Sequence, residues 1–291
     1  MNVLAFGEIL WDIIEGENHL GGAPFNFAAH VVKCGGKSSI ISAVGMDTLG
    51  QQAIAQAKAL GVDVSLVVSL PDKPTGTVDV FLKEGQPDYT IHEGVAFDAI
   101  PLPSANLILN KSFDVFYFGS LTQRGRTSRE SLQWILDNVK FKQVFYDINV
   151  RKNFFSKEIV ENSLRHCTVF KINDSEAQTI SLLFYNSALG LEDFARKIAT
   201  DFTIEVVIIT AAEKGCYLLK DNVFNHVKGE IVKVVDAVGA GDSFSAAFMK
   251  SYVTDGDEKK AAVIANRVGG FVASSRGAIP SYSEEILSLF K

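Results

Sequence analysis

Short apolar runs alternate with longer amphipathic stretches along most of the chain. The runs are rich in β-branched and aromatic residues, which is typical of strands, and the stretches between them predict helices. The runs that predict strands are Val3–Phe6, Ser39–Val44, Val115–Phe118, Val144–Tyr146, Val169–Ile172 and Val206–Ile209. Strands that alternate with helices form a parallel sheet covered on both faces. We therefore expect an α/β fold with a mostly parallel central sheet flanked by helices.

Glycine and proline punctuate the predicted helices. Pro24 opens a helix that ends before Gly35, and a second helix stops at Gly61, as expected for helix ends. The predicted helices are Phe25–Cys34, Leu49–Leu60, Ser243–Val253, Glu258–Ser274 and Glu284–Phe290. No repeat, low-complexity segment or long linker divides the chain, so we expect one domain over residues 1–291.

Two stretches have the alternation of antiparallel hairpins. One joins Cys216–Lys220 to Val223–Val227, and the other is Thr75–Ile91. Because the second interrupts the βα pattern, we expect a small β-sheet lid formed approximately by residues 8–22 and 72–98. A closing lid excludes water, and its apolar side chains also suggest a homodimer through the lid. The apolar candidates are Phe81, Tyr89, Ile91 and Phe97.

Composition and charge narrow the classes of function. The chain has 291 residues, of which 47% are hydrophobic, and its net charge of −6 argues against nucleic acid or an anionic membrane as the main partner. The three cysteines and five histidines lack the spacings of a disulfide framework or a zinc site. The N-terminus resembles a first strand more than a signal peptide, and no long apolar run predicts a membrane helix. We therefore expect a cytoplasmic protein.

Polar residues gather just after the predicted strands. In open parallel sheets, ligands bind in the crevice beyond the carboxyl ends of the strands. The polar segments at those ends are Gly119-Ser120, Asp147–Arg151, Asn173–Glu176, Thr210–Gly215 and Asp236–Asp242. So many clusters at one edge favour a ligand site over ordinary turns.

The most informative segment follows the strand-like run Ile231–Val235. Gly239, Ala240 and Gly241 carry almost no side chain, so their N–H groups can approach an anion closely. The helix that starts here adds unpaired N–H groups and the positive end of its dipole. Asp242 lies beside this nest, which suggests a base that activates a nucleophile attacking phosphorus. The alternative is that Asp242 is an ordinary acid of a first helical turn.

A second glycine-rich loop precedes the first helix. Gly21 and Gly22 let a ligand lie against the backbone, and Asn26 offers both a donor and an acceptor to a hydroxyl. Asp12 and Asn26 together could bind a polyol, with turn and cap chemistry as the alternative. The GKS triplet at residues 36–38 resembles the end of a P-loop, but it follows a helix instead of opening one. A Rossmann fingerprint and a G-x-S-x-G elbow are also absent from the sequence.

Both glycine-rich segments resemble the signatures of one family. GGAPFNFA at residues 21–28 and DAVGAGDSFSAAF at residues 236–248 are similar to the two signatures of the PfkB (ribokinase-like) carbohydrate kinases. NDSE at residues 173–176 matches the family's N-x-x-E motif. The resemblance covers essentially the whole chain and is greatest to fructokinases, through GGAPFNFA, YTIHEGVAFD and YDINVR. Ala237 departs from the threonine of many relatives, so any role of that hydroxyl is absent here.

The resemblance implies ATP-dependent phosphorylation of a sugar hydroxyl. Asp242 would accept the proton of the attacking hydroxyl, and the backbone N–H groups of Gly239, Ala240, Gly241 and Asp242 would form an anion hole for the phosphoryl group. The residues implied to bind the sugar are Asp12, Gly21, Gly22, Asn26 and Arg151. Sequence position leaves open whether Arg151 reaches the sugar or a phosphate.

The same resemblance implies nucleotide and cation sites. Asn173 and Glu176 would organise Mg²⁺ through water; a helix cap is the alternative, and both can hold. The implied nucleotide-binding residues are Asn173, Glu176, Thr210, Gly215, Gly241 and Asn266. The family also commonly binds a monovalent cation, and the matching positions for K⁺ are Asp236, Val238, Val272, Ser275, Gly277 and Ser281.

The leading hypothesis is a fructokinase that forms fructose 6-phosphate from D-fructose and ATP. A kinase for ribose or for 2-keto-3-deoxygluconate is an alternative within the class, and a carboxylated substrate would point to Arg151 as its partner. An alternative of another class is a sugar- or nucleotide-binding protein that has lost catalysis. Loss of Asp242 or of the glycine turn would be its signature, and both are intact.

Overall fold

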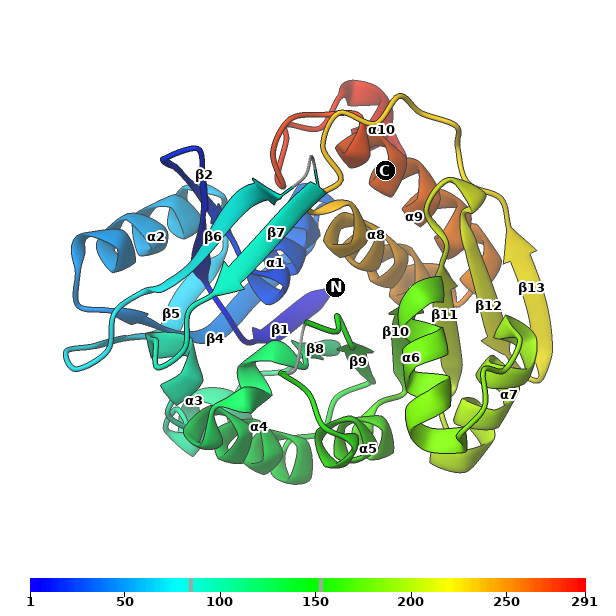
Figure 1. The fold of residues 1–291 in the computed structure, drawn as a ribbon, viewed down its shortest axis with the longest axis horizontal. Helices are drawn as coiled ribbons and strands as arrows, with labels where there is room; N and C mark the ends of the chain where they lie inside the picture. The colour runs from blue at the N-terminus through cyan, green and yellow to red at the C-terminus, as the bar shows by residue number, and fades with distance from the viewer. Residues whose placement is uncertain (84–85, 152–153) are drawn as a thin grey trace.

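A twisted sheet runs through the centre of the molecule (Figure 1). The computed structural model describes residues 1–83, 86–151 and 154–291, and it describes their side chains except those of residues 80–83 and 86–88. Within these residues the central sheet contains β1 (Asn2–Phe6), β4 (Lys37–Gly45), β5 (Asp63–Leu70), β8 (Val115–Gly119), β9 (Gln143–Asp147), β10 (Val169–Asn173), β11 (Val206–Thr210), β12 (Cys216–Lys220) and β13 (Val223–Val227). Their order is β13-β12-β11-β10-β9-β8-β1-β4-β5.

Most neighbouring strands of this sheet are parallel, as the alternation of apolar runs predicts. The exception is β12, which runs antiparallel to both β11 and β13 and forms the expected hairpin. Parallel strands end at the same edge of the sheet, so the polar segments that follow β8, β9, β10 and β11 meet there.

Helices cover both faces of the sheet (Figure 1). The helices whose buried side chains share one core are α1 (Ala23–Lys33), α2 (Thr48–Ala59), α8 (Ala240–Asp255), α9 (Glu258–Ala273) and α10 (Glu284–Ser288). The helices that pack in the second core are α3 (Ala105–Leu109), α4 (Arg126–Asn138), α5 (Lys157–His166), α6 (Asp174–Tyr185) and α7 (Leu191–Phe202). The strands are buried between these two layers, which explains their continuous apolar runs.

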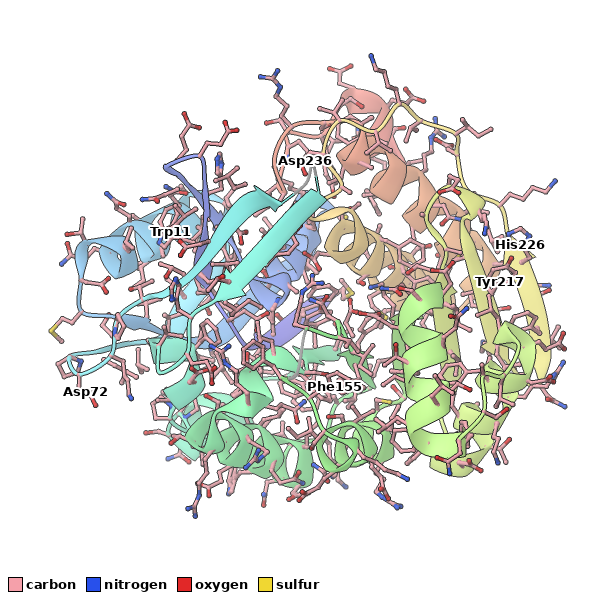
Figure 2. All side chains as sticks on the ribbon, viewed as in Figure 1. Trp11, Asp72, Phe155, Tyr217, His226 and Asp236 are labelled. Carbon is pink, nitrogen blue, oxygen red and sulfur yellow. The ribbon has the colours of Figure 1, made fainter. Side chains whose placement is uncertain are left out.

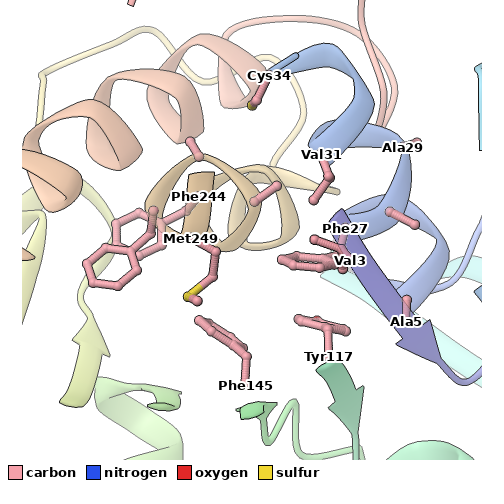
Figure 3. Close-up of a cluster of buried hydrophobic side chains, with 14 of the residues drawn as sticks. Val3, Ala5, Phe27, Ala29, Val31, Cys34, Tyr117, Phe145, Phe244 and Met249 are labelled. Atoms are coloured by element: carbon pink, nitrogen blue, oxygen red, sulfur yellow. The ribbon is translucent and has the colours of Figure 1, made fainter. Parts of the chain in front are cut away.

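Aromatic packing fixes α1 and α8 against the sheet (Figure 3). Phe27 of α1 stacks on Tyr117 of β8 with ring centroids 3.9 Å apart. Phe145 of β9 stacks on Tyr117 as well, with centroids 5.6 Å apart. Phe244 and Met249 of α8 are buried in the same cluster. Because α1 and α8 both begin at the carboxyl edge of the sheet, this packing brings the two glycine-rich segments together.

A four-stranded sheet lies beside the main one. Its strands, within the described residues, are β2 (Leu10–Ile14), β3 (Glu17–Gly21), β6 (Gly76–Lys83) and β7 (Gln86–Ile91), in the order β3-β2-β6-β7. The β6–β7 hairpin is antiparallel as predicted, whereas β2 and β6 pair in parallel. The small sheet of the predicted fold is thus confirmed, and we call it the lid. The side chain of Phe81 lies outside the described residues, and the dimer through the lid stays a prediction.

The strand-like run before α8 does not form a strand. Ile231–Val235 has no strand neighbour among the described residues, and the side chain of Ile231 is 95% exposed. The N–H groups of Val235 and Asp236 instead both donate to the carbonyl of Ala273 at the end of α9. Because β13 already ends the sheet, the chain here must cross from that edge to the start of α8, and this connection overrides the strand propensity of its valines.

No helix in the described part of the chain is long and apolar enough to cross a membrane.

Candidate active site

The turn that begins α8 has the geometry of an anion site. Gly239 is the N-cap, with φ of 79°, and a Cβ there would lie 2.3 Å from the carbonyl oxygen of Ala278. Only glycine fits both constraints. Among the described residues, the N–H groups of Gly241 and Asp242 find no acceptor. These two donors and the positive end of the α8 dipole make the turn attractive to a phosphate.

Asp242 is held at this turn by the first helix. The amide nitrogen of Asn26 donates to its carboxylate at 2.8 Å, which joins α1 to α8. Burial, followed by the negative charge of Asp147, raises the pKa of Asp242 to about 7; Asn26, Lys171 and Arg151 act in the opposite direction. Asp242 can therefore take up a proton near neutral pH, which is the property of a general base.

The other amide atom of Asn26 points to a ligand. Asn26 is 4% exposed, and its carbonyl oxygen is buried without a hydrogen-bond partner in the described part of the chain. The nitrogen must face Asp242 because a carboxylate accepts and does not donate. The oxygen is thus an open acceptor beside the base, where a hydroxyl group could donate.

A buried ion pair lies behind the turn. Lys171 of β10 donates to both carboxylate oxygens of Asp147 at 2.9 and 2.8 Å, and Tyr117 and Ser245 each donate to Asp147 at 3.2 Å. A Cβ on Gly241 would lie 3.5 Å from the Lys171 ammonium. Burial opposes the charge of Lys171, but Asp147 raises its pKa above the ordinary lysine value. Sequence reasoning missed Lys171, although a lysine inside an apolar strand signals a buried partner.

Asp12 is the middle residue of strand β2 in the lid. A Cβ on Gly21 would come within 2.6 Å of its carboxylate. Gly22, with φ of 110°, would bring a Cβ within 2.5 Å of the carbonyl oxygen of Glu8. Packing within the protein therefore already requires glycine at both positions. Burial raises the pKa of Asp12 to about 6, while the charge of Arg151 lowers it.

Arg151 provides positive charge between the lid and α8. It is exposed, and its guanidinium lowers the pKa of three carboxyl groups, those of Glu8, Asp12 and Asp242. Sequence reasoning assigned no role to Glu8. It is 3% exposed and accepts a hydrogen bond from Thr122 at 2.6 Å, and burial raises its pKa. An acid that interrupts the first apolar run was the available signal.

Asn173 and Glu176 form a capping box at the start of α6. The Asn173 side chain accepts from the N–H of Glu176 at 2.8 Å, and Glu176 accepts from the N–H of Asn173 at 3.0 Å. The second carboxylate oxygen of Glu176 accepts from Val150 at 2.7 Å, which ties the loop after β9 to α6. The cap interpretation is therefore confirmed. A carboxylate already bonded to two N–H groups suits a magnesium ion held through water better than one held directly. Thr210 lies beside Asn173 in the sheet.

Gly215 and Asn266 meet at the end of β13. Asn266 of α9 donates to the carbonyls of Val227 and Lys228 at 3.1 and 3.2 Å. Gly215 has φ of 91°, and a Cβ there would lie 2.2 Å from the Val227 carbonyl oxygen. Both residues shape this corner of the sheet, and their contact with a nucleotide stays a prediction.

Asp236 joins the two loops of the expected potassium site, and Figure 2 shows it near the start of α8. Its carboxylate accepts from the N–H groups of Val238 and Gly277 at 3.0 and 3.1 Å. The Val272 carbonyl already accepts from Ser275 at 2.9 Å. Expected carbonyl ligands that accept no hydrogen bond from any described residue are those of Val238, Ser275, Gly277 and Ser281. A carboxylate with open carbonyls is an oxygen set that fits a hard cation.

Comparison with known proteins relates this geometry to a function. A family model described as pfkB family carbohydrate kinase matches residues 4–285. The chain is 28% identical over 309 residues to an uncharacterized sugar kinase of Pyrococcus horikoshii, covering 99% of this chain and 95% of that protein. It is 26% identical over 319 residues to fructokinase-2 of Solanum lycopersicum, covering 99% and 96%.

Solved structures share the fold. The Pyrococcus horikoshii kinase in complex with ATP has a TM-score of 0.80 at 25% identity, covering 95% of this chain and 94% of that one. A fructokinase of Vibrio cholerae bound to fructose, ADP and calcium has a TM-score of 0.85 at 22% identity, covering 99% and 98%. These likenesses confirm the predicted fold class.

Proposed function

Because the chain belongs to the PfkB family of carbohydrate kinases, we propose that it phosphorylates a neutral sugar with ATP, and that the sugar is D-fructose. The observation that carries this proposal is that Asp242 lies in the α8 turn together with N–H groups that have no hydrogen-bond acceptor among the described residues. A base and an anion site lie within one helical turn, and Asn26 fixes the base from the opposite helix. This is the arrangement that in-line transfer of a phosphoryl group requires.

The residues of the turn account for the transfer step. Asp242 accepts the proton of the sugar hydroxyl while its oxygen bonds to the γ-phosphorus, and the bond to the β,γ-bridging oxygen breaks to release ADP. The N–H groups of Gly241 and Asp242 stabilise the charge on the phosphoryl oxygens. Loss of one such donor costs about 2.7–4 kcal/mol in other enzymes. The proton leaves Asp242 for solvent once the product departs.

Two cations would assist this step. Mg²⁺, organised through water by Glu176, would neutralise charge on the ATP phosphates. A potassium ion at Asp236 and the open carbonyls around it would stiffen the loops that support Gly239. Both assignments rest on the oxygen atoms described above and on the resemblance to the family.

The charges of the pocket favour a neutral sugar over a sugar acid. Glu8, Asp12 and Asp242 are carboxyl groups whose pKa values burial already raises, and Arg151 is the positive charge that acts on all three. A further carboxylate from 2-keto-3-deoxygluconate would have to compete with them for Arg151. Charge does not separate fructose from ribose; the likeness to the tomato fructokinase favours fructose.

A panel of sugars tests this proposal. D-fructose, D-ribose and 2-keto-3-deoxygluconate are each incubated with ATP and Mg²⁺, ADP release is followed, and the product is identified by ³¹P and ¹³C NMR. We expect fructose to give the highest kcat/KM and fructose 6-phosphate as the product. ADP release that no sugar raises above the sugar-free rate would contradict a kinase role and favour the binding protein. A preference for D-ribose would overturn only the assignment to fructose, and a preference for 2-keto-3-deoxygluconate would also overturn the choice of a neutral sugar.

A further inference from the structure

A buried arginine lies beneath the lid, outside the residues assigned to the reaction. Arg124 ends the short 3₁₀ segment η2 (Leu121–Arg124) after β8, and its side chain is 7% exposed. Its guanidinium donates to both carboxylate oxygens of Asp98, at 2.7 and 3.2 Å, and to the carbonyl oxygen of His92. His92 directly follows β7, so this one side chain holds the segment by which the chain leaves the lid.

The segment held by Arg124 is itself tightly ordered. Asp98 lies in η1 (Ala96–Ala99) and accepts from the N–H groups of Gly94 and Val95 at 2.9 and 3.3 Å. Phe97 is buried against the first residue of β6, because a Cβ on Gly76 would lie 2.5 Å from its ring. The two ends of the β6–β7 hairpin are therefore joined at the residues that Arg124 contacts.

The same guanidinium lies over two aromatic rings, and one of them, Phe154, belongs with Arg151 to the loop after β9, which we call the Arg151 loop. Its central carbon lies 4.9 Å from the ring centroid of Phe97 and 4.5 Å from that of Phe154. The N–H of Phe154 donates to the carbonyl of Arg151 at 3.0 Å. Arg124 thus contacts the base of the lid and the loop whose arginine acts on the sugar-side carboxylates.

The chemistry of this position requires arginine. A planar fork can bond both oxygens of a carboxylate and stack on rings at the same time, whereas a lysine ammonium cannot. One guanidinium nitrogen, Nη1, is nevertheless buried without an acceptor among the described residues. A buried charged donor without an acceptor lowers the stability of the folded protein. A role in positioning neighbouring groups therefore explains Arg124 better than a contribution to stability alone.

We propose that Arg124 is a positioning residue for sugar binding, which sets the base of the lid and the Arg151 loop relative to each other. Closing the lid and placing Arg151 over the sugar are then one event. This inference rests on the proposed function and deepens it. ATP binds at the other end of the site, at the α8 turn, so it is not expected to depend on Arg124.

The test compares two arginines two residues apart. Arg124→Lys keeps the charge but loses the fork, and we expect the KM for D-fructose to rise about 10-fold or more while the KM for ATP stays unchanged. Arg126→Lys is the matched control, because Arg126 is 84% exposed and pairs with Glu130 on its own helix. The control should leave both KM values unchanged. Sugar-free ATP hydrolysis should also rise in Arg124→Lys, since a misplaced lid admits water.

A double-mutant cycle tests the link to the Arg151 loop. Phe154→Leu and Arg124→Lys act through one contact, so their combined effect on the KM for D-fructose should be smaller than the product of the separate effects. Multiplying effects would overturn the link. Equal rises in both KM values, or a lower Tm with unchanged KM values, would show a purely structural role and overturn the proposal. If Arg124→Lys does not fold, Asp98→Asn gives the same comparison with a milder change.

The wild-type enzyme separates this proposal from the proposed function. If wild type phosphorylates no sugar, the function itself is wrong before any variant is measured. If wild type is active and Arg124→Lys shows no split between the two KM values, the function stands and the role of Arg124 falls.

Discussion

The α8 turn and the sugar side beneath the lid are built in opposite ways. The turn places its donors and its base within the consecutive residues 239–242, so local backbone geometry determines their positions. The proposed sugar side assembles Asp12, Arg124 and Arg151 from β2, η2 and the loop after β9. A site built from one turn fails when a single residue changes, whereas a site built from several elements loses function by degrees. The reaction should therefore be fixed in this fold, and the choice of sugar adjustable.

The base of the turn gives the largest expected effect. Asp242→Asn should lower kcat by about 10²–10⁴-fold while ATP still binds, because general bases contribute that much. Turnover close to that of wild type would rule out Asp242 as the base.

Asp242→Asn should lower kcat, but it should raise the stability of the protein above about pH 7. Burial raises the pKa of Asp242 from 3.8 to about 7. Between about pH 4 and about pH 7, Asp242 therefore holds a proton in the folded protein that it releases in the unfolded chain. This contribution to stability is present below about pH 4 and is lost as the pH rises through about 7. Asp242→Asn does not titrate, so above about pH 7 its Tm should exceed that of wild type. A lower Tm there would contradict the burial argument.

The two glycines that flank α8 give the next largest effect. Gly239 and Gly256 both have positive φ, of 79° and 73°, but a Cβ on Gly256 would meet nothing within 4 Å. Gly239→Ala must displace the Ala278 carbonyl or the turn, so kcat should fall by about 10²–10³-fold, as when an oxyanion donor is lost. Gly256→Ala is the matched control and should cost about 1–2 kcal/mol of stability with kcat unchanged. Equal kcat values in the two variants would show that the turn does not hold the phosphoryl group.

The contrast between the regions also explains what the sequence could predict. Strands β8 to β11 and the α8 turn depend on patterns within a few residues, and these predictions match the structure closely. Ile231–Val235 has the same apolar composition as those strands, but the sheet has already ended at β13. Strand β5 was not predicted, because its half-exposed edge position gives a weak pattern.

The missed site residues share one physical cause. Lys171, Glu8 and Arg124 are charged side chains in largely apolar surroundings, and each has a partner that is far away in the sequence: Asp147, Thr122 and Asp98. The role of each residue depends on a contact formed in the tertiary structure, which a single sequence does not reveal. The sequence does flag Lys171 and Glu8 as charges inside apolar runs, and buried charges are rarely unpaired. Arg124 follows a polar segment, so no such signal marks it.

Asp12 gives an intermediate effect that belongs to the sugar side. Asp12→Asn removes a charged acceptor, so the KM for D-fructose should rise about 10–100-fold, equivalent to the loss of one hydrogen bond to a charged group, with the KM for ATP unchanged. Val78 lies directly opposite Asp12 in the lid, so the neighbouring Asp79 faces the other side of that sheet. Asp79→Asn is therefore the control and should change neither constant. A rise in the KM for ATP in Asp12→Asn would place Asp12 outside the sugar pocket.

The smallest expected effect is a shift in the pH dependence of kcat. It involves Asn26 of α1, whose hydrogen bond to Asp242 connects α1 to the α8 turn. The proposed base role needs the charged form of Asp242, so kcat should fall as the pH drops through about 7. The hydrogen bond from Asn26 favours the charged form, so Asn26→Ala should raise the pKa of Asp242 and move this acid limb to higher pH. The negative charge of Asp147 acts the other way, so Asp147→Asn should move the limb to lower pH. That variant unpairs Lys171 and costs about 3–5 kcal/mol of stability, so its profile is recorded well below its Tm. Shifts in the same direction would mean that the limb belongs to a group other than Asp242.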